Sequence, residues 1–525
     1  MSSFVLVASA QATVTSSSIT SPSDPYFGFD NGQSITVSGT SNGTSGDQVN
    51  IVCYNDNGST GTVERNAASN VAVNADGSFS TSVALSQLRG DTCRLRAVDH
   101  NSTPSTGLAS YSGPRVSVAY LDRYPSSGAP LYDYYVYAPQ LTAADDYDSY
   151  AGCGLSDSYL FDPSVFGQED SVGFYCNDYA DKTSESNPAR TAVLVDGHPA
   201  YAPEEEYRIN SAGAGFEPLV INSVTQDSSN GNLTIVETDP LVRCVGDAYP
   251  ATSSNCAAFV ASGVQVKRTI TQNDDGHIVY IRDAYSSTDG AAHSADLLME
   301  NDQRFFGNSS SQNVQYEFPG QSAFSAYSVG QSVSVPAGAP ASILIQNGGT
   351  ADGATNGGRG AITYAQTPSG PFKFGYDNGC CSDFDAPNTV SVPASGTAKV
   401  AYAYSSEFTL AKAQHDALVA QDAFQKPALK ITSPRNHSKV KAKTRRIKVK
   451  GTASAGSGVK SVTVNGRKVT VSGGKFSTTV RLHTGKNTIK VKLTSAAGNT
   501  VRKSVTVTRV KAAKAKKKPA PTFTG

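Results

Sequence analysis

The stretch VKSVTVNGRKVTVSGGKFSTTVRLHTGKNTIKVKLTSAAGN, residues 459–499, alternates apolar and polar side chains and is interrupted by Asn-Gly and Gly-Gly pairs. In an extended chain, Ile489 and Val491 share one face, while Lys490 and Lys492 share the other. Such strands bury one face and leave the other in water, and the Asn and Gly pairs predict tight hairpins between them. The stretch therefore predicts an antiparallel β-sandwich.

Two segments near opposite ends of the chain repeat one pattern. GSFSTSVAL at 77–85 matches GKFSTTVRL at 474–482, and each follows a similar strand, SITVSGT at 34–40 or RIKVKGT at 446–452. We therefore expect the two ends to be copies of one module with different insertions.

Four sequence elements within residues 427–510 carry a family resemblance. V-x-V-N-G, G-x-F-S, L-x-x-G-x-N-x-I and A-G-N together resemble the bacterial immunoglobulin-like module of the glucodextranase B type, found beside catalytic domains in secreted carbohydrate-active enzymes. The copy at 33–118 matches less closely because it carries a longer insertion. The resemblance implies a spacer or adhesion unit without catalytic residues of its own.

The central region, residues 119–405, is too long for one small sandwich and contains no long amphipathic helix pattern. Strands are predicted at 264–270 and 277–285, joined by the NDDG turn at 273–276. These hairpins resemble the large supersandwich of mutarotase-like and glucodextranase N-terminal domains. In that enzyme family a helical barrel carries catalysis, and no segment here would form one.

The pattern SSEFTLAKAQHDALVAQDAF at 405–424 predicts a helix that ends before the basic module. Ser405 or Ser406 is its expected cap. Its apolar stripe is expected at Phe408, Ala411, Leu418 and Phe424.

The sequence thus predicts a mostly β, multidomain chain in which immunoglobulin-like β-sandwiches flank a larger antiparallel β-sandwich. The 47 glycines and 25 prolines in 525 residues are typical of short strands joined by turns. The expected parts are a signal-peptide remnant at 1–12, a Ser/Thr-rich linker at 13–32, an immunoglobulin-like domain at 33–118, the central domain at 119–405, a linker helix at 406–424, a basic immunoglobulin-like domain at 425–510 and a basic, disordered tail at 511–525.

The N-terminus and the cysteines indicate export. MSSFVLVASAQA has a short apolar run and A-x-A patterns, as at the end of a signal peptide, and no segment has the roughly 18 apolar residues of a membrane-spanning helix. We expect an extracellular, bacterial, cell-surface protein without a membrane span. The eight cysteines form no zinc pattern, so they indicate disulfides. The simplest pairs are Cys53 with Cys93, Cys153 with Cys176 and Cys244 with Cys256, although other connectivities are open and the adjacent Cys380 and Cys381 pair either together or elsewhere.

A net charge of zero hides a strong division along the chain. Residues 426–525 hold 26 of the 44 Lys and Arg and none of the 44 Asp and Glu, which gives +26, and residues 1–425 therefore carry 18 − 44 = −26. Such asymmetry indicates either an anionic partner for the basic part or its folding back onto the acidic body. The expected polyanion-binding residues are Lys441, Lys443, Arg445, Arg446, Lys448, Lys450, Lys490 and Lys492.

Teichoic or uronic polymers of a cell wall are partners within reach of an exported protein. Nucleic acid would be bound only non-specifically through its backbone, because no base-reading motif is present.

The richest polar cluster of the central region lies within 273–296. A sugar site needs an aromatic ring that stacks on pyranose C–H groups and planar side chains that hydrogen-bond hydroxyls. The candidate ligand-binding residues are Tyr280, Arg282, Asp283 and His293, and the alternative is an ordinary β-hairpin surface.

The sequence does not identify catalytic residues. The G-x-S-x-G elbow, the phosphate-binding loop and the H-E-x-x-H helix are absent, and carboxylates such as those of 204–206 are too numerous for spacing to select a glycosidase pair. No cofactor is expected, with calcium as an option at two acidic loops without EF-hand spacing. These loops contain Asp145, Asp146 and Asp148, and Asp377, Asp383 and Asp385.

The leading hypothesis is a secreted or cell-surface, non-catalytic protein that binds glycan or an anionic cell-wall polymer, with the basic C-terminal module as anchor. The rival is a carbohydrate-active enzyme, or its accessory subunit, that acts on extracellular polysaccharide through the central domain.

Overall fold

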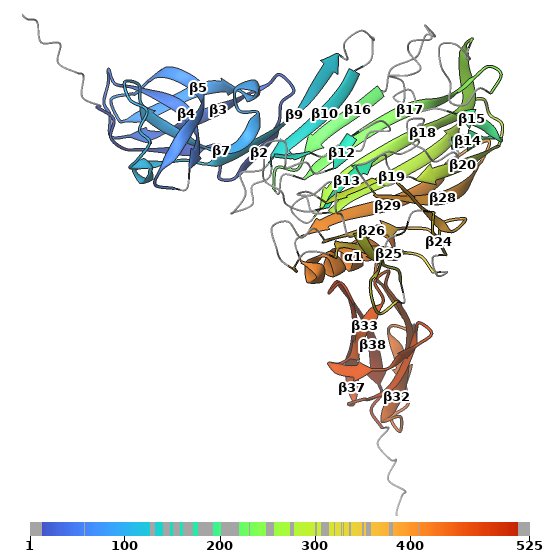
Figure 1. Cartoon of the computed structure of the whole chain (residues 1–525). Helices are drawn as coiled ribbons and strands as arrows, with labels where there is room; N and C mark the ends of the chain where they lie inside the picture. The colour runs from blue at the N-terminus through green and yellow to red at the C-terminus, as the bar shows by residue number, and fades with distance from the viewer. Residues whose placement is uncertain are drawn as a thin grey trace, which may run out of the picture. The chain divides into compact units, whose positions relative to one another are not determined.

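The computed structural model describes residues 13–512 except for gaps at 57, 126–131, 140–147, 151–157, 161–171, 177–192, 201–219, 230–231, 248–256, 274–277, 300–301, 306–313, 320, 327, 329, 335–337, 349–350, 353–358, 377–381 and 408. The chain forms two compact units. One comprises Met1–Ala337, Ile343–Ile362 and Thr367–Ala413, and the other Gly338–Ser342, Thr363–Gln366 and Gln414–Gly525. The mostly β fold with several sheets in sandwich domains is confirmed (Figure 1).

The N-terminal module packs two sheets around one core. The first sheet, in the order β6-β3-β1-β8, contains β1 (Ser17–Ser21), β3 (Ser34–Ser41), β6 (Ser78–Ala84) and β8 (Tyr111–Ser112). The second, in the order β11-β10-β9-β7-β4-β5 with β2 beside β9, contains β2 (Tyr26–Phe29), β4 (Gln48–Asp56), β5 (Gly61–Ala72), β7 (Gly90–Asp99), β9 (Arg115–Pro125), β10 (Tyr132–Pro139) and β11 (Asp148–Tyr150). Two 3₁₀ turns are η1 (Leu85–Gln87) and η2 (Leu108–Ser110).

Strand β1 lies inside the stretch that we expected to be a linker. It pairs antiparallel with β3, and Ile19 is buried in the core, so the first strand of this module precedes the expected start at residue 33. The sequence pattern did not predict this strand, because Ile19 is its only large apolar residue and the others are Ser and Thr.

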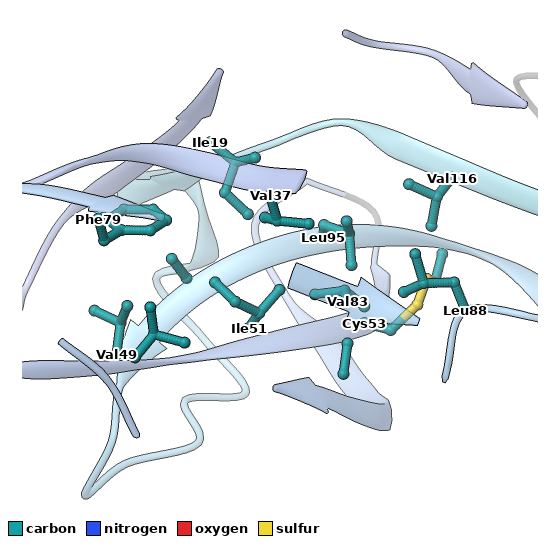
Figure 2. Packing of buried hydrophobic residues seen from close by; sticks show 14 of the residues in the cluster. Ile19, Val37, Val49, Ile51, Cys53, Phe79, Val83, Leu88, Leu95 and Val116 are labelled. Carbon is teal, nitrogen blue, oxygen red and sulfur yellow. A yellow bond between two sulfur atoms is a disulfide. The ribbon is translucent and has the colours of Figure 1, made fainter. Parts of the chain in front are cut away.

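The core between these sheets holds a disulfide. Figure 2 shows Ile19, Phe79 and Leu95 among the buried side chains, with the sulfur bond at Cys53. Cys53 and Cys93, predicted as a pair, are joined with their Cα atoms 5.4 Å apart. Cys244 is also disulfide-bonded. Cys153, Cys256, Cys380 and Cys381 lie outside the described residues, and of Cys176 only the backbone is described, so the other predicted pairs stay predictions.

The central region contains two large antiparallel sheets. One, in the order β16-β17-β18-β19-β29-β26-β25-β22-β23, runs through the green to orange strands of Figure 1. Its strands are β16 (Val220–Gln226), β17 (Leu233–Cys244), β18 (Phe259–Asn273), β19 (Ile278–Ser287), β22 (Val314–Glu317), β23 (Ser325–Ala326), β25 (Ala341–Asn347), β26 (Arg359–Tyr364) and β29 (Ala398–Glu407). The other, in the order β12-β13-β21-β28-β20-β14-β15 with β27 and β24 beside β28, contains β12 (Ser158–Leu160), β13 (Val172–Cys176), β14 (Val193–Val195), β15 (His198–Ala200), β20 (His293–Met299), β21 (Asp302–Phe305), β24 (Ser332–Val333), β27 (Phe372–Tyr376) and β28 (Ser382–Val392).

Helix α1 (Leu410–Phe424) begins later than predicted. Ser405 lies in β29, which pairs with β19, so neither Ser405 nor Ser406 caps the helix. Thr409 takes that place, because its Oγ1 accepts a hydrogen bond from the Lys412 amide at 3.4 Å. The buried apolar face is formed by Ala413, Ala417 and Ala420, whereas the predicted stripe has Ala411 exposed, Leu418 and Phe424 half-buried and Phe408 outside the described residues.

The C-terminal module is a second two-sheet sandwich. One sheet, in the order β30-β32-β36-β35, contains β30 (Ala428–Ser433), β32 (Arg446–Ser454), β35 (Val471–Ser472) and β36 (Lys475–Arg481). The other, in the order β31-β38-β37-β33-β34, contains β31 (Ser438–Val440), β33 (Val459–Val464), β34 (Arg467–Val469), β37 (Gly485–Ser495) and β38 (Thr500–Arg509).

The two modules share one register. A Cβ atom at Gly39 would lie 2.0 Å from the Ser18 carbonyl oxygen, and one at Gly451 would lie 2.3 Å from that of Lys430. Both glycines therefore allow the same close approach of neighbouring strands. The phenylalanine of the repeated G-x-F-S element lies against the glycine in each copy, which supports the expected internal repeat.

Within the second compact unit, Asp422 of α1 is bound by the C-terminal module. Its Oδ1 accepts hydrogen bonds from the Ser457 amide and hydroxyl at 2.9 and 2.8 Å, and its Oδ2 accepts from Ser495 Oγ at 2.5 Å and Asn499 Nδ2 at 2.9 Å. Burial raises the pKa of Asp422, but these donors outweigh it and hold the pKa below its ordinary value. Nearby, only glycine fits at position 456, because a Cβ atom there would lie 1.9 Å from the Gln421 carbonyl oxygen of α1.

In the described part of the chain, no helix has the length and apolar character needed to cross a membrane.

Candidate functional site

Two of the four predicted ligand-binding residues of the central domain contact each other. The Arg282 guanidinium lies over the Tyr280 ring at 4.9 Å from its centroid and donates a hydrogen bond to Thr271 Oγ1 at 2.9 Å. Tyr280 is only 3% exposed, and burial lowers the pKa of Arg282. The arginine therefore already covers the ring that was expected to stack on a sugar.

Asp283 lies in a buried ion pair instead of on a surface. Arg268, directly opposite on β18, donates from Nε and Nη2 to its two carboxylate oxygens at 2.8 and 2.6 Å. Arg268 Nη2 also donates to the Tyr402 hydroxyl at 3.2 Å. Both charged side chains are at most 1% exposed, so the pair forms part of the sheet's interior.

His293 is held between two carboxylates. Its Nδ1 lies 2.7 Å from Asp196 Oδ2 and its Nε2 lies 2.9 Å from Asp289 Oδ1. Because an ionised carboxylate only accepts hydrogen bonds, both ring nitrogens must donate, which requires the imidazolium form. The hydrogen bonds that His293 donates to Asp196 and Asp289 accordingly raise the pKa of His293. Hydrogen bonds from the Ala291 amide and from His293 lower the pKa of Asp289 to about 2.

This cluster predicts a titration that NMR can follow. The folded-state pKa of His293 is raised above its ordinary 6.5, so its stabilisation is complete below pH 6.5 and is lost as the pH rises through the folded-state pKa. We expect the His293 ring signals to titrate with a midpoint clearly above 6.5. His293→Gln should remove those signals and assign them, and a midpoint at or below 6.5 would contradict the imidazolium assignment.

The four candidates of the central domain therefore do not share one surface. Tyr280 and Arg282 contact each other, Asp283 pairs with Arg268, and the hydrogen bonds of His293 go to two other aspartates. A ligand-binding role for the four stays a prediction. Asp145, Asp146 and Asp377 of the predicted calcium loops lie outside the described residues, as do the side chains of Asp148, Asp383 and Asp385.

The predicted polyanion-binding residues lie at the surface of the C-terminal module. Lys441, Lys443 and Arg445 are exposed in the segment between β31 and β32. Along β32, Arg446, Lys448 and Lys450 are exposed and alternate with Ile447, Val449 and Gly451, of which Val449 and Gly451 are buried. On β37, Lys490 is exposed and Lys492 is half-buried. The predicted alternation of these strands thus agrees with the observed burial.

Cross-strand register adds cations that the sequence pattern did not single out. Lys430 and Lys475 both lie opposite Thr452, and Arg481 lies opposite Arg446. Residues directly opposite each other on neighbouring strands point to the same side of a sheet. We call the resulting set the first basic face, formed by Lys430, Arg446, Lys448, Lys450, Lys475 and Arg481.

A second basic face covers the outer side of the other sheet. Arg502 lies opposite Lys492, which also lies opposite Thr463, and Thr463 in turn lies opposite Lys468. The second basic face is formed by Lys468, Lys486, Lys490, Lys492 and Arg502.

Each face brings like charges together without an acid nearby in the sequence. Arg446 opposes Arg481 on the first face, and Lys492 opposes Arg502 on the second. Like charges directly opposite each other destabilise a sheet. Residues 426–525 contain no Asp or Glu that could offset this repulsion. Any anions that balance these cations must therefore come from outside residues 426–525.

The module lacks the groups that recognise a neutral sugar by stacking. Phe476 is the only Phe, Tyr or Trp in residues 427–510, and it is 3% exposed. Neither a sugar ring nor a nucleobase can therefore stack on a Phe, Tyr or Trp ring of this module. The chemistry available on its outer faces is that of cations and hydroxyls.

Parts of this chain are similar to known proteins. Bacillopeptidase F of Bacillus subtilis (strain 168) is 40% identical over 82 residues, which are 15% of this chain and 6% of that protein. An α-galactosidase from Lactobacillus brevis has 9% identity and a TM-score of 0.27, covering 58% of this chain and 41% of that one. The fibronectin(III)-like modules of Clostridium thermocellum CbhA have 13% identity and a TM-score of 0.15, covering 43% of this chain and 91% of that one.

The chain thus spans less than half of the α-galactosidase and a small part of bacillopeptidase F. At such low TM-scores, the two structural likenesses carry no argument about chemistry. Residues 427–510, which form the C-terminal sandwich, match the family described as glucodextranase, domain B. This match confirms the resemblance predicted from the V-x-V-N-G, G-x-F-S and A-G-N elements.

Proposed function

We propose that this chain is an exported, non-catalytic surface protein that binds glycan or an anionic cell-wall polymer, with its basic C-terminal module as the anchor. The observation that carries the proposal is the first basic face, in which six cations stand on one side of a sheet without any acid.

The N-terminal module is an internal control for this observation. Its β3 and β6 pair Ser34 with Ala84 and Thr40 with Ser78, the same register that pairs Arg446 with Arg481 and Thr452 with Lys475. The positions equivalent to the six cations of the first basic face are Ser18, Ser34, Thr36, Ser38, Ser78 and Ala84.

All six equivalent residues are uncharged, although the backbone pairing is the same. The immunoglobulin-like sandwich therefore does not require cations at these positions. Because opposed like charges weaken a sheet, the cations of the first basic face have a role other than folding, and binding a polyanion is the role that their chemistry supports.

Two observations support export to the cell surface. The Cys53–Cys93 disulfide lies in the core of the N-terminal module, and disulfides persist in oxidising compartments. In addition, 82 residues of this chain match bacillopeptidase F, and residues 427–510 match a domain named for glucodextranase.

The test uses the full chain and co-sedimentation with purified bacterial cell walls. A first-face variant takes the residues of the N-terminal copy: Lys430→Ser, Arg446→Ser, Lys448→Thr, Lys450→Ser, Lys475→Ser and Arg481→Ala. A second-face variant carries Lys468→Gln, Lys486→Gln, Lys490→Gln, Lys492→Gln and Arg502→Gln. A both-face variant combines them, and Lys448→Arg with Lys450→Arg serves as the charge-preserving control.

We expect salt to release the intact protein, because neutralising each phosphate or carboxylate frees a counterion. The both-face variant should bind at least about 10-fold more weakly at low salt, and the charge-preserving control should bind like the intact protein. Equal wall binding by the both-face variant would contradict the anchor. Release of product from a wall polysaccharide by the intact protein would contradict the non-catalytic assignment.

A further inference from the structure

The two basic faces lie on different sheets of one sandwich. Val449 of β32 and Val491 of β37 are both buried in the core between these sheets. Because successive side chains of a strand point to opposite faces, Lys448 and Lys490 point away from this core on opposite sides of the module. Packed sheets lie about 10 Å apart, so a straight polymer chain on one face cannot reach the other.

Each face carries a row of cations along one strand. Alternate residues of a strand are about 6.6 Å apart, so Arg446, Lys448 and Lys450 form a row of cations at that interval. On the second face, Lys490 and Lys492 are one such interval apart, and Lys486 precedes Lys490 by two intervals, with Thr488 between them. An extended polymer that carries one negative charge in each repeat of about 6.6 Å could contact neighbouring cations along β32 or along β37.

Hydroxyl groups accompany the cations on both faces. Lys448 lies opposite Thr479 and Lys450 opposite Ser477 on the first face, while Lys490 lies opposite Ser504 on the second. An ammonium or guanidinium group beside a hydroxyl suits the non-bridging oxygens of a phosphodiester, which only accept hydrogen bonds. Residues 427–510 contain no carboxylate side chain to accept hydrogen bonds from sugar hydroxyls, and their only Phe, Tyr or Trp, Phe476, is buried.

From these observations we propose that the C-terminal module binds two chains of a phosphodiester-linked wall polymer, one on each basic face, and thereby bridges them. This inference rests on the proposed function. It adds the chemical class of the polymer and the number of polymer chains that one module binds. The bridge would cross-link neighbouring polymer chains as well as retain the protein at the wall.

The probe is purified poly(glycerol phosphate), added to the intact full chain and to the three face variants. Titration calorimetry gives the number of polymer sites on each protein molecule and their affinity, and light scattering reports cross-linking. All variants keep the tail from residue 511 onward unchanged. Scattering of each protein without polymer controls for self-association.

We expect the intact protein to bind with two equivalent sites and to produce strong scattering. Each single-face variant should keep one site with an affinity within about 2-fold of the original, because screening confines surface electrostatics to about a Debye length. Scattering should fall to the level of the polymer alone in both single-face variants, and the both-face variant should lose both sites.

Three outcomes would overturn the inference. One is a single-face variant that still cross-links the polymer. A second is a loss of affinity at the remaining face of more than about 10-fold, which would show that all the cations act as one field around the module. The third is tighter binding of polygalacturonate or duplex DNA than of poly(glycerol phosphate), which would assign the faces to another polyanion.

The two proposals fail in different ways. If the both-face variant still sediments with cell walls, the anchor itself is wrong. If it loses wall binding while the single-face variants still cross-link poly(glycerol phosphate), the anchor holds and only the bridging is wrong.

Discussion

Arg268→Ala is expected to lower the free energy of unfolding of the central domain by about 3–5 kcal/mol, because it leaves the Asp283 carboxylate buried without its partner. The two hydrogen bonds of the pair, at 2.8 and 2.6 Å, satisfy both carboxylate oxygens, and each side chain is at most 1% exposed. Denaturant unfolding, followed by a probe in β18 or β19, measures the effect.

Two controls separate the buried charge from a general loss of packing. Arg268→Met with Asp283→Leu removes both charges and should be far less destabilising than Arg268→Ala, because apolar residues can replace a buried pair. Arg115→Ala breaks the exposed pair with Asp24 and should cost at most about 1 kcal/mol. If Arg268→Ala cost no more than Arg115→Ala, the buried pair would not stabilise the sheet.

Asp422→Ala is expected to lower the free energy of unfolding of the second compact unit by roughly 2–4 kcal/mol, because hydrogen bonds to a charged, buried acceptor are strong and their donors would lose their partner. Ser457, Ser495 and Asn499 donate to this carboxylate from three places along the C-terminal module. Hydrogen exchange at the Ser457 amide should accelerate, since its acceptor is removed. Asp76→Ala, which removes an exposed aspartate bonded to Ser78, is the matched control and should leave that exchange unchanged.

The Asp422 carboxylate also predicts that the second compact unit loses stability in acid. The folded-state pKa of Asp422 is lowered from 3.8, so its stabilisation is present above pH 3.8 and is lost as the pH falls through the folded-state pKa. Asp422→Asn should remove this part of the acid dependence. An unchanged acid profile in that variant would indicate that the Asp422 hydrogen bonds do not depend on its charge.

The alternation of apolar and polar residues correctly predicted which side chains are buried in strands that have one side in water. The alternation in RIKVKG and NTIKVKL correctly placed Val449 and Ile489 inside and Lys448 and Lys490 outside. The same rule failed for the polar cluster on β19, because this strand is covered on both sides along much of its length and buries Tyr280 and Asp283 alike.

Register between strands could not be read from the sequence alone. Lys475 and Arg481 lie opposite Thr452 and Arg446 only because β36 pairs with β32, and nothing in either segment fixes that alignment. The Asp422 cluster was missed for the same reason, since its partners follow it by 35 to 77 residues and belong to no local motif. The strand at Ser17–Ser21 was missed because one isoleucine among hydroxyl residues is a weak apolar signal.

The shared register of the two modules has a consequence for how this chain could evolve. The positions that face inward are occupied alike, with Gly39 and Gly451 each beside a phenylalanine, because a larger side chain there would collide with the next strand. The outward positions differ completely in charge while the pairing of the strands is the same. Substitutions at the outward positions alone could therefore give one copy a charged face that the other lacks, without any change in how its strands pair.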